Sequence, residues 1–68
     1  MRIVNKLGKL KTYTTVVELN STEIDECLKR LVNENDLDVR WWLHQRIRLN
    51  REENDRLTKM IEVLNGKD

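Results

Sequence analysis

Few residues of this chain could perform chemistry, and they are poorly grouped. The 68 residues include one cysteine, Cys27, and one histidine, His44. A structural zinc site needs four such ligands, so we expect no metal and no cofactor. Glu52 and Glu53 are adjacent carboxylates, but a catalytic pair needs a pocket, which a chain of this length is too small to form. The sequence also has no glycine-rich phosphate loop and no nucleophile–base pair, so we expect that it is not an enzyme.

Two adjacent tryptophans, Trp41 and Trp42, raise the question of what they pack against. A chain of this length buries only about 60% of its unfolded surface, and small domains usually depend on disulfides, a metal or a partner. One cysteine excludes an internal disulfide and fits a reducing, cytoplasmic setting. We therefore expect a single domain that self-associates.

Neither a signal peptide nor a membrane span is predicted. The first residues alternate polar and apolar, unlike the apolar core of a signal peptide. No segment approaches the roughly 20 apolar residues of a transmembrane helix.

Charge is distributed in blocks. Residues 1–17 carry four bases and no acid, and residues 18–38 carry seven acids and two bases. Residues 39–51 again carry four bases and no acid, and residues 52–68 carry five acids and three bases. The two basic blocks can form one polarised surface if the fold brings them together. A scatter of solubilising charge is the alternative.

The first third of the chain has the composition of a strand. Residues 9–19 are rich in β-branched and aromatic side chains. The period of two places Tyr13, Val17 and Leu19 on the face that we expect to point to the core. Residues 1–9 ahead of it predict either a mobile basic arm or, with a turn at Gly8, a hairpin strand.

Two helices are predicted to follow. Asn20 or Ser21 can cap the first, and its apolar stripe consists of Ile24, Leu28, Leu31 and Val32. Asn35 and Asp36 interrupt the pattern. Asp38 is placed to cap a second helix that begins near Val39.

The second helical region has the clearest periodicity. Seven residues of this region are spaced alternately by four and three: Leu43, Ile47, Asn50, Asn54, Leu57, Ile61 and Leu64. Isoleucine at a and leucine at d favour a parallel coiled coil between two chains, and an asparagine at a fixes its register. We therefore predict that residues 50–68 form an oligomerisation segment, with Asn54, Leu57, Ile61 and Leu64 in the coil. The stretch from Asn50 to Glu53 also reads as a capping box, so a break near Leu49 is the alternative to one continuous helix.

This order of elements is that of the ribbon-helix-helix fold, and the stretch LKRLVNENDLDVRWWLHQRI resembles the core of the Arc/Mnt-type phage repressor family. An apolar pair, Leu31-Val32, ends the first helix as it does in the family. Asn35-Asp36 stands where the family often has Asn-Gly. Matching spacings continue at Val39, Leu43, Gln45-Arg46 and Ile47. The resemblance covers roughly residues 13–50.

The resemblance implies a mostly α chain with one N-terminal β-strand, folded as an interleaved dimer over residues 10–49. In such a dimer the paired strands enter the major groove. The implied DNA contacts are Lys9, Lys11, Thr12 and Thr14 at the groove, with Arg2, Lys6 and Arg40 on phosphates. The implied dimer core consists of Val17, Leu28, Leu31, Trp42, Leu43 and Ile47, with Trp41 at its rim.

Two functions from different classes follow. The first is a repressor-like transcriptional regulator that binds double-stranded DNA in a sequence-specific manner as a homodimer or tetramer. The alternative is a small protein-binding inhibitor or antirepressor module of phage type, on a related fold and without DNA binding. Basic residues near the N-terminus favour the first. Outward-facing Glu18 and Asp38 repel phosphates and favour the second.

Overall fold

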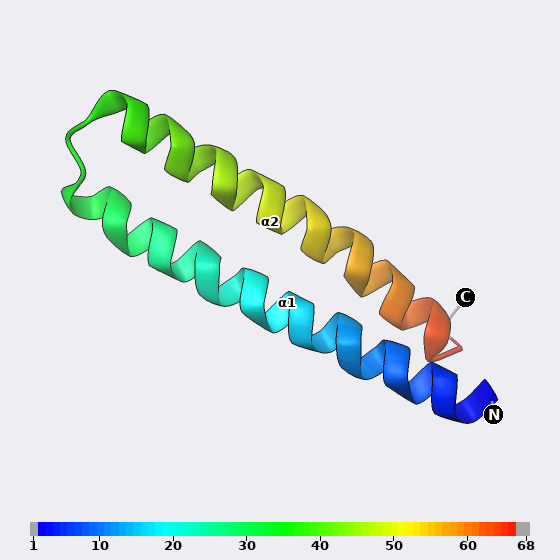
Figure 1. Cartoon of the computed structure of the whole chain (residues 1–68). Helices are drawn as coiled ribbons and strands as arrows, with labels where there is room; N and C mark the ends of the chain where they lie inside the picture. Colours follow the sequence, from blue (N-terminus) through cyan, green and yellow to red (C-terminus); the bar gives the residue numbers. More distant parts are fainter. Residues whose placement is uncertain (1, 67–68) are drawn as a thin grey trace.

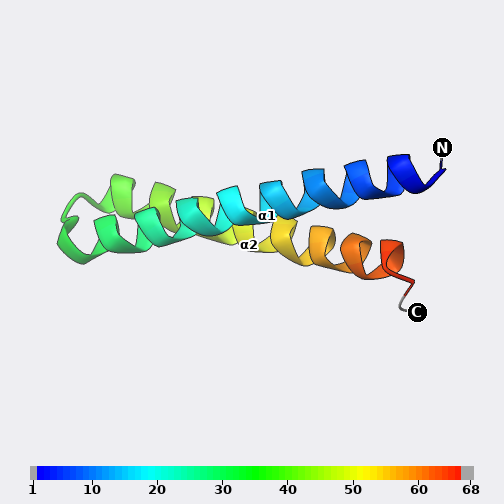
Figure 2. The same ribbon diagram turned by 90° about the horizontal axis from the view of Figure 1, so that it is seen from below.

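The computed structural model describes residues 2–66, with side chains from Lys6 onward, and shows a helical hairpin (Figure 1). α1 spans Arg2–Asn33 and α2 spans Leu37–Leu64. The two helices run antiparallel beside each other, so both ends of the chain lie at the same end of the hairpin. Turned by 90°, the helices cross at a shallow angle (Figure 2).

The predicted N-terminal strand is wrong, because residues 9–19 lie inside α1 and residues 2–66 contain no strand. The predicted ribbon-helix-helix fold and its interleaved dimer are wrong for the same reason, and residues 2–9 of the predicted arm or hairpin strand belong to α1. The physical reason is a stripe at helical spacing that runs through the whole segment: Leu10, Tyr13, Val17, Asn20, Ile24, Cys27 and Leu31. The helix propensities of β-branched residues differ from those of good helix formers by less than about 1 kcal/mol each. Burial of one continuous stripe outweighs that difference.

The threonines that favoured a strand are accommodated by bonds one turn back along α1. The Thr12 hydroxyl donates to the Gly8 carbonyl at 2.9 Å, and the Thr15 hydroxyl donates to the Lys11 carbonyl at 2.8 Å. Such bonds satisfy a hydroxyl within a helix. Asn20 and Ser21, predicted as caps, are also interior residues of this helix.

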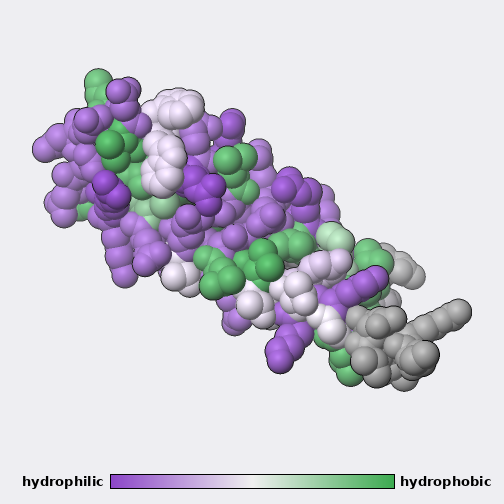
Figure 3. Space-filling view, in the orientation of Figure 1, coloured by the Kyte–Doolittle hydropathy of each residue, from purple (hydrophilic) through white to green (hydrophobic). Residues whose placement is uncertain are grey.

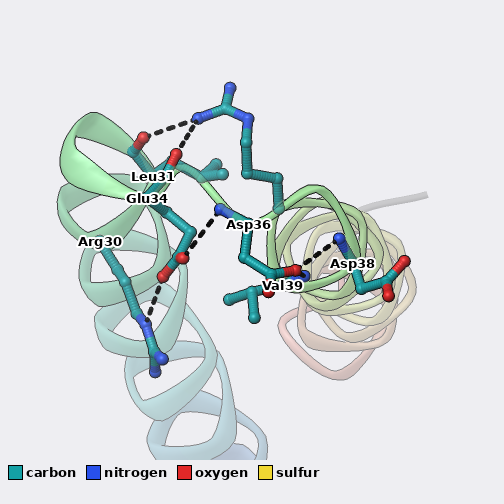
Figure 4. A network of polar contacts seen from close by, with 7 residues as sticks. Arg30, Leu31, Glu34, Asp36, Asp38 and Val39 are labelled. Carbon is teal, nitrogen blue, oxygen red and sulfur yellow. Dashed lines mark hydrogen bonds and ion pairs between the residues drawn. The ribbon is translucent and has the colours of Figure 1, made fainter.

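The start of α2 is fixed by Asp36, two residues before the predicted cap at Asp38 (Figure 4). The Asp36 carboxylate accepts from the backbone N–H groups of Asp38 at 2.9 Å and Val39 at 3.2 Å. The Asp36 N–H donates to the Glu34 carboxylate at 3.2 Å. A carboxylate cap also favours the positive end of the helix dipole.

The end of α1 is closed by Arg40, which reaches back from α2. Its guanidinium donates to the backbone carbonyls of Leu31 at 2.9 Å and Glu34 at 3.1 Å. The last carbonyls of a helix have no partner within the helix, so Arg40 supplies one from outside. Glu34 is also paired with Arg30 at 3.5 Å (Figure 4). Arg40 therefore holds the turn through one guanidinium nitrogen, and its predicted phosphate contact stays a prediction.

The hydrophobic core lies near the connecting turn. Its buried members are Cys27, Leu31, Leu43 and Ile47, with Ile24 and Val39 packed against them. Three of the residues predicted for a dimer core are thus buried within a single chain. The other three are not buried, since Leu28 is 43% exposed, Trp42 is 50% exposed and Val17 is half-buried.

α2 is continuous through Leu49, so the capping-box break near that residue does not occur. The heptad spacing is confirmed as a helix face, but its predicted partner is wrong. Leu57, Ile61 and Leu64 are half-buried on the face that packs antiparallel on α1 of the same chain. They do not need a parallel copy of α2 to be covered. Residues 67–68 of the predicted coil segment lie outside the described residues.

The cap at Asp36 yields a direct test of the turn. Replacing a capping aspartate by alanine typically costs about 1 kcal/mol, whereas asparagine caps nearly as well. We expect Asp36→Ala to lower the free energy of unfolding in urea by about that amount, and Asp36→Asn to change it little. An equal loss in both variants would show that the carboxylate charge, and not the cap, stabilises the turn.

Candidate protein interface

Midway along the hairpin, polar side chains replace the apolar core. Asn50 is 6% exposed, and its side-chain amide donates to the Glu23 carboxylate at 2.5 Å. The Arg46 guanidinium donates to the same oxygen of Glu23 at 2.7 Å. These two bonds, that from Arg46 first, lower the pKa of the Glu23 carboxyl below its ordinary value. Glu23 is therefore held ionised between the helices.

A second set of polar contacts lies one turn further from the connection. The Asn20 amide donates to the Glu53 carboxylate at 2.7 Å and to the Asn54 side-chain oxygen at 3.0 Å. The Asn54 amide in turn donates to the Ser21 hydroxyl at 3.3 Å and the Val17 carbonyl at 3.5 Å. We call these residues the polar layer: Asn20, Ser21, Glu23, Arg46, Asn50, Glu53 and Asn54.

The polar layer fixes how α1 and α2 align. Every buried side-chain nitrogen and oxygen in the described part of the chain has a hydrogen-bond partner. Sliding one helix past the other would break these pairs, and an unsatisfied buried polar group costs about 1–3 kcal/mol. The sequence pattern identified Asn50 and Asn54 as core positions. It did not identify their partners Asn20 and Glu23, since Asn20 was predicted as a helix cap.

Cys27 lies beside the polar layer, and its thiol is buried. It is 6% exposed. Burial raises the pKa of its thiol, and the nearby Glu23 charge raises it further. The thiolate is the reactive form of cysteine, so at neutral pH this residue behaves as a small apolar core group.

A second stripe runs along α2, beside the one that faces α1. Its members are again spaced by four and three: Trp42, Arg46, Leu49, Glu53, Arg56, Met60 and Val63. Large apolar side chains of this stripe are exposed to water: Trp42 is 50%, Leu49 49% and Val63 68% exposed. On α1, Leu19 is 64% exposed and lies one turn before Glu23, which bonds to this stripe. We call this side of the hairpin, from Trp42 to Val63 on α2 and from Lys9 to Arg30 on α1, the open flank.

Three hollows follow one another along the open flank, each lined by both helices. The first is lined by Trp42 with Glu26 and Arg30, the second by Leu49 with Asn20 and Arg56, and the third by Met60 and Val63 with Lys9 and Tyr13. They lie in a row from near the turn to the open end of the hairpin. On the face in Figure 3, hydrophobic residues gather near the turn and again toward the termini, with hydrophilic residues between them.

The predicted DNA-binding residues do not converge. Lys6, Lys9, Lys11, Thr12 and Thr14 are all exposed on the first part of α1. Arg40 caps α1 at the other end of the hairpin, about 30 Å from Lys9 at 1.5 Å per helical residue. The side chain of Arg2 lies outside the described residues. The fold therefore separates the two basic blocks instead of joining them.

The remaining chemistry-bearing residues stay dispersed. Within residues 2–66, no three histidine, cysteine, aspartate or glutamate side chains are grouped so that they could hold a metal ion. Neither described helix combines the length and the apolar character that a bilayer span requires. No protein-family model, curated protein or solved structure matches this chain.

The lowered pKa of Glu23 predicts a pH dependence of stability. A carboxyl whose pKa is lower in the folded state stabilises the fold above its unfolded pKa, about 4.3 for glutamate. That contribution is lost as the pH falls through the lowered value. We expect the free energy of unfolding to fall between neutral pH and pH 3, and Glu23→Gln to remove part of this fall while lowering stability at neutral pH.

Urea unfolding followed by circular dichroism at several pH values measures the effect. Glu26→Gln is the matched control, because it removes the same charge from the same helix without touching the polar layer. An acid-induced loss of the same size in Glu23→Gln and in the unmodified chain would contradict the role of the Glu23 carboxylate.

Proposed function

We propose that this chain is a protein-interaction module that assembles with a second copy of itself through the open flank, giving a four-helix bundle. One observation carries the proposal: large apolar side chains along one flank are between 44% and 68% exposed, beside a core of four buried residues. Contiguous exposed apolar patches on soluble proteins are typical of protein-binding surfaces.

The size of the core supports this reading. A single hydrophobic core in a chain of this length rarely supplies more than about 3–5 kcal/mol. Packing two hairpins together turns two small cores into one larger core, which is how helical hairpins form four-helix bundles. The short length of the chain indicates that it needs a partner. The open flank is the surface where that partner would bind.

The polar residues of the open flank favour covering it with protein. Arg46 already pairs with Glu23, and Glu53 already accepts from Asn20. Groups that are satisfied within the chain need no new partner when water leaves. Covering this flank therefore removes apolar surface from water without leaving these charges unpaired.

Substitution at the middle of the flank tests the proposal. Leu49→Lys would remove the apolar contact that the exposed half of the Leu49 side chain makes in each copy. It would also bring a positive charge from each copy together at the interface. We expect association to weaken by at least about 2 kcal/mol per dimer, roughly thirtyfold. Sedimentation velocity over a range of concentrations measures the mass in solution.

Val32→Lys is the matched control, because Val32 is 80% exposed and lies off the open flank. The unmodified chain and this control should sediment with twice the mass of one chain, while Leu49→Lys sediments as a monomer. A stable monomeric unmodified chain would reject self-assembly and leave a different protein as the occupant of the flank.

A second candidate is DNA binding through the first part of α1. The observation that favours it is that Lys6, Lys9 and Lys11 are exposed where residues 1–17 include no acid. Contacts of a paired β-ribbon with the major groove are excluded, because the residues of the predicted strand lie in α1. In a DNA-binding regulator, α1 itself would therefore be the DNA-binding element, and the exposed Thr14 could contact bases.

Duplex binding followed by fluorescence anisotropy at several salt concentrations tests this candidate. Log affinity should fall with log salt with a slope of about −0.9 per phosphate neutralised. Lys9→Ala should flatten that slope by up to about 0.9 per chain, and Thr14→Ala should weaken one preferred sequence more than random duplex. An absence of binding at low salt would remove DNA from the possible partners.

A further inference from the structure

We infer that the two copies pack antiparallel, with the Trp42 indole of each seated in the cleft at the open end of the other. The inference rests on the proposed self-assembly and specifies its geometry. The cleft is lined by Tyr13, Met60, Val63 and Leu64, with Lys9 and Lys59 at its rim, and has a volume of about 310 Å³.

The positions of the indole and the cleft on α2 are self-complementary. Trp42 and Met60 are 18 residues apart, which is five whole turns of helix, so they lie on one line along α2. The midpoint of α2 falls between Asn50 and Arg51. Trp42 lies about as far before that midpoint as Lys59 and Met60 lie after it. A two-fold axis through the middle of the flank therefore brings each indole over the other copy's cleft.

Such a pairing is the form that symmetric dimers require. In a two-fold interface the same surface serves both partners, so a residue i that contacts j implies that j contacts i. The open flank presents a projecting aromatic ring near one end and a hollow near the other. Leu19 and Leu49 lie near half its length, where each would face the equivalent region of the second copy.

The chemistry of the cleft suits an indole. Methionine sulfur makes favourable contacts with aromatic rings, and lysine ammonium groups are attracted to the face of tryptophan more than to other rings. Trp42 is 50% exposed in the single chain. Seating its ring between Met60 and the rim lysines would cover that surface with groups matched to it.

The charges along α1 fit the antiparallel arrangement. The first half of α1 is basic, with four bases and no acid in residues 1–17, and residues 18–38 are acidic, with seven acids and two bases. Antiparallel packing places the basic half of one copy at the level of the acidic half of the other.

A nitroxide label on the rim of the cleft tests this geometry. In a Trp41→Phe, Cys27→Ala background Trp42 is the only tryptophan, and Lys59→Cys carries the only label. Within one chain positions 42 and 59 are about 25 Å apart at 1.5 Å per residue, too far for contact quenching. Seated across the dimer, the Trp42 ring touches the rim, so most of its emission should be lost and should return on dilution to monomer.

Glu62→Cys, labelled in the same background, is the matched control. Position 62 lies at the same end of α2 but on the opposite side of the helix from Trp42, and a label there should leave the emission unchanged. If removal of the buried thiol unfolds the hairpin by circular dichroism, Cys27→Val replaces it.

Sedimentation of the labelled protein separates the possible failures. A dimer whose Trp42 emission is equal with labels at 59 and 62 overturns the antiparallel seating and leaves the proposed self-assembly standing. An unmodified chain that is monomeric at all concentrations overturns both. Quenching by the label at 59 alone, in the dimer alone, supports the seating.

Discussion

A pair of helices can bury only one stripe of each helix against the other, and this limit governs the structure. α1 and α2 use that contact line for Cys27, Leu31, Leu43 and Ile47 near the turn and for the polar layer in the middle. Most large apolar side chains beside the line are exposed to water. Because the second stripe of α2 still carries Trp42 and Leu49 there, the hairpin has an exposed apolar surface that the proposed second copy would cover.

The polar layer and the apolar core have different roles. The core supplies burial but tolerates sliding, since apolar contacts are not directional. The bonds of Glu23 to Arg46 and Asn50, and of Asn20 to Glu53, exist in one alignment only. The same alignment shapes the open flank, because it sets which residues of α1 line the three hollows. A change in the layer would thus alter the interface as well as the hairpin.

Part of this structure could be predicted from the sequence. The spacing from Leu43 to Leu64 identified the face of α2, and Asn35-Asp36 marked the turn. The β-branched composition of residues 9–19 predicts a strand, but the helical spacing of Leu10, Tyr13 and Val17 determines the structure. A heptad does not say which chain covers it, so the partner of α2 was misassigned. The role of Arg40 could not be predicted, since its acceptors are backbone carbonyls of Leu31 and Glu34 that converge only in the folded turn.

Contact between two copies can be observed directly in solution. In an equimolar mixture of isotope-labelled and unlabelled chain, filtered nuclear Overhauser spectra report only contacts between different molecules. Assembly through the open flank predicts cross-chain signals from the Trp42 indole to the side chains of Met60 and Val63, and between Leu49 methyl groups. Spectra of a folded hairpin with no cross-chain signal at high concentration would contradict self-assembly through this surface.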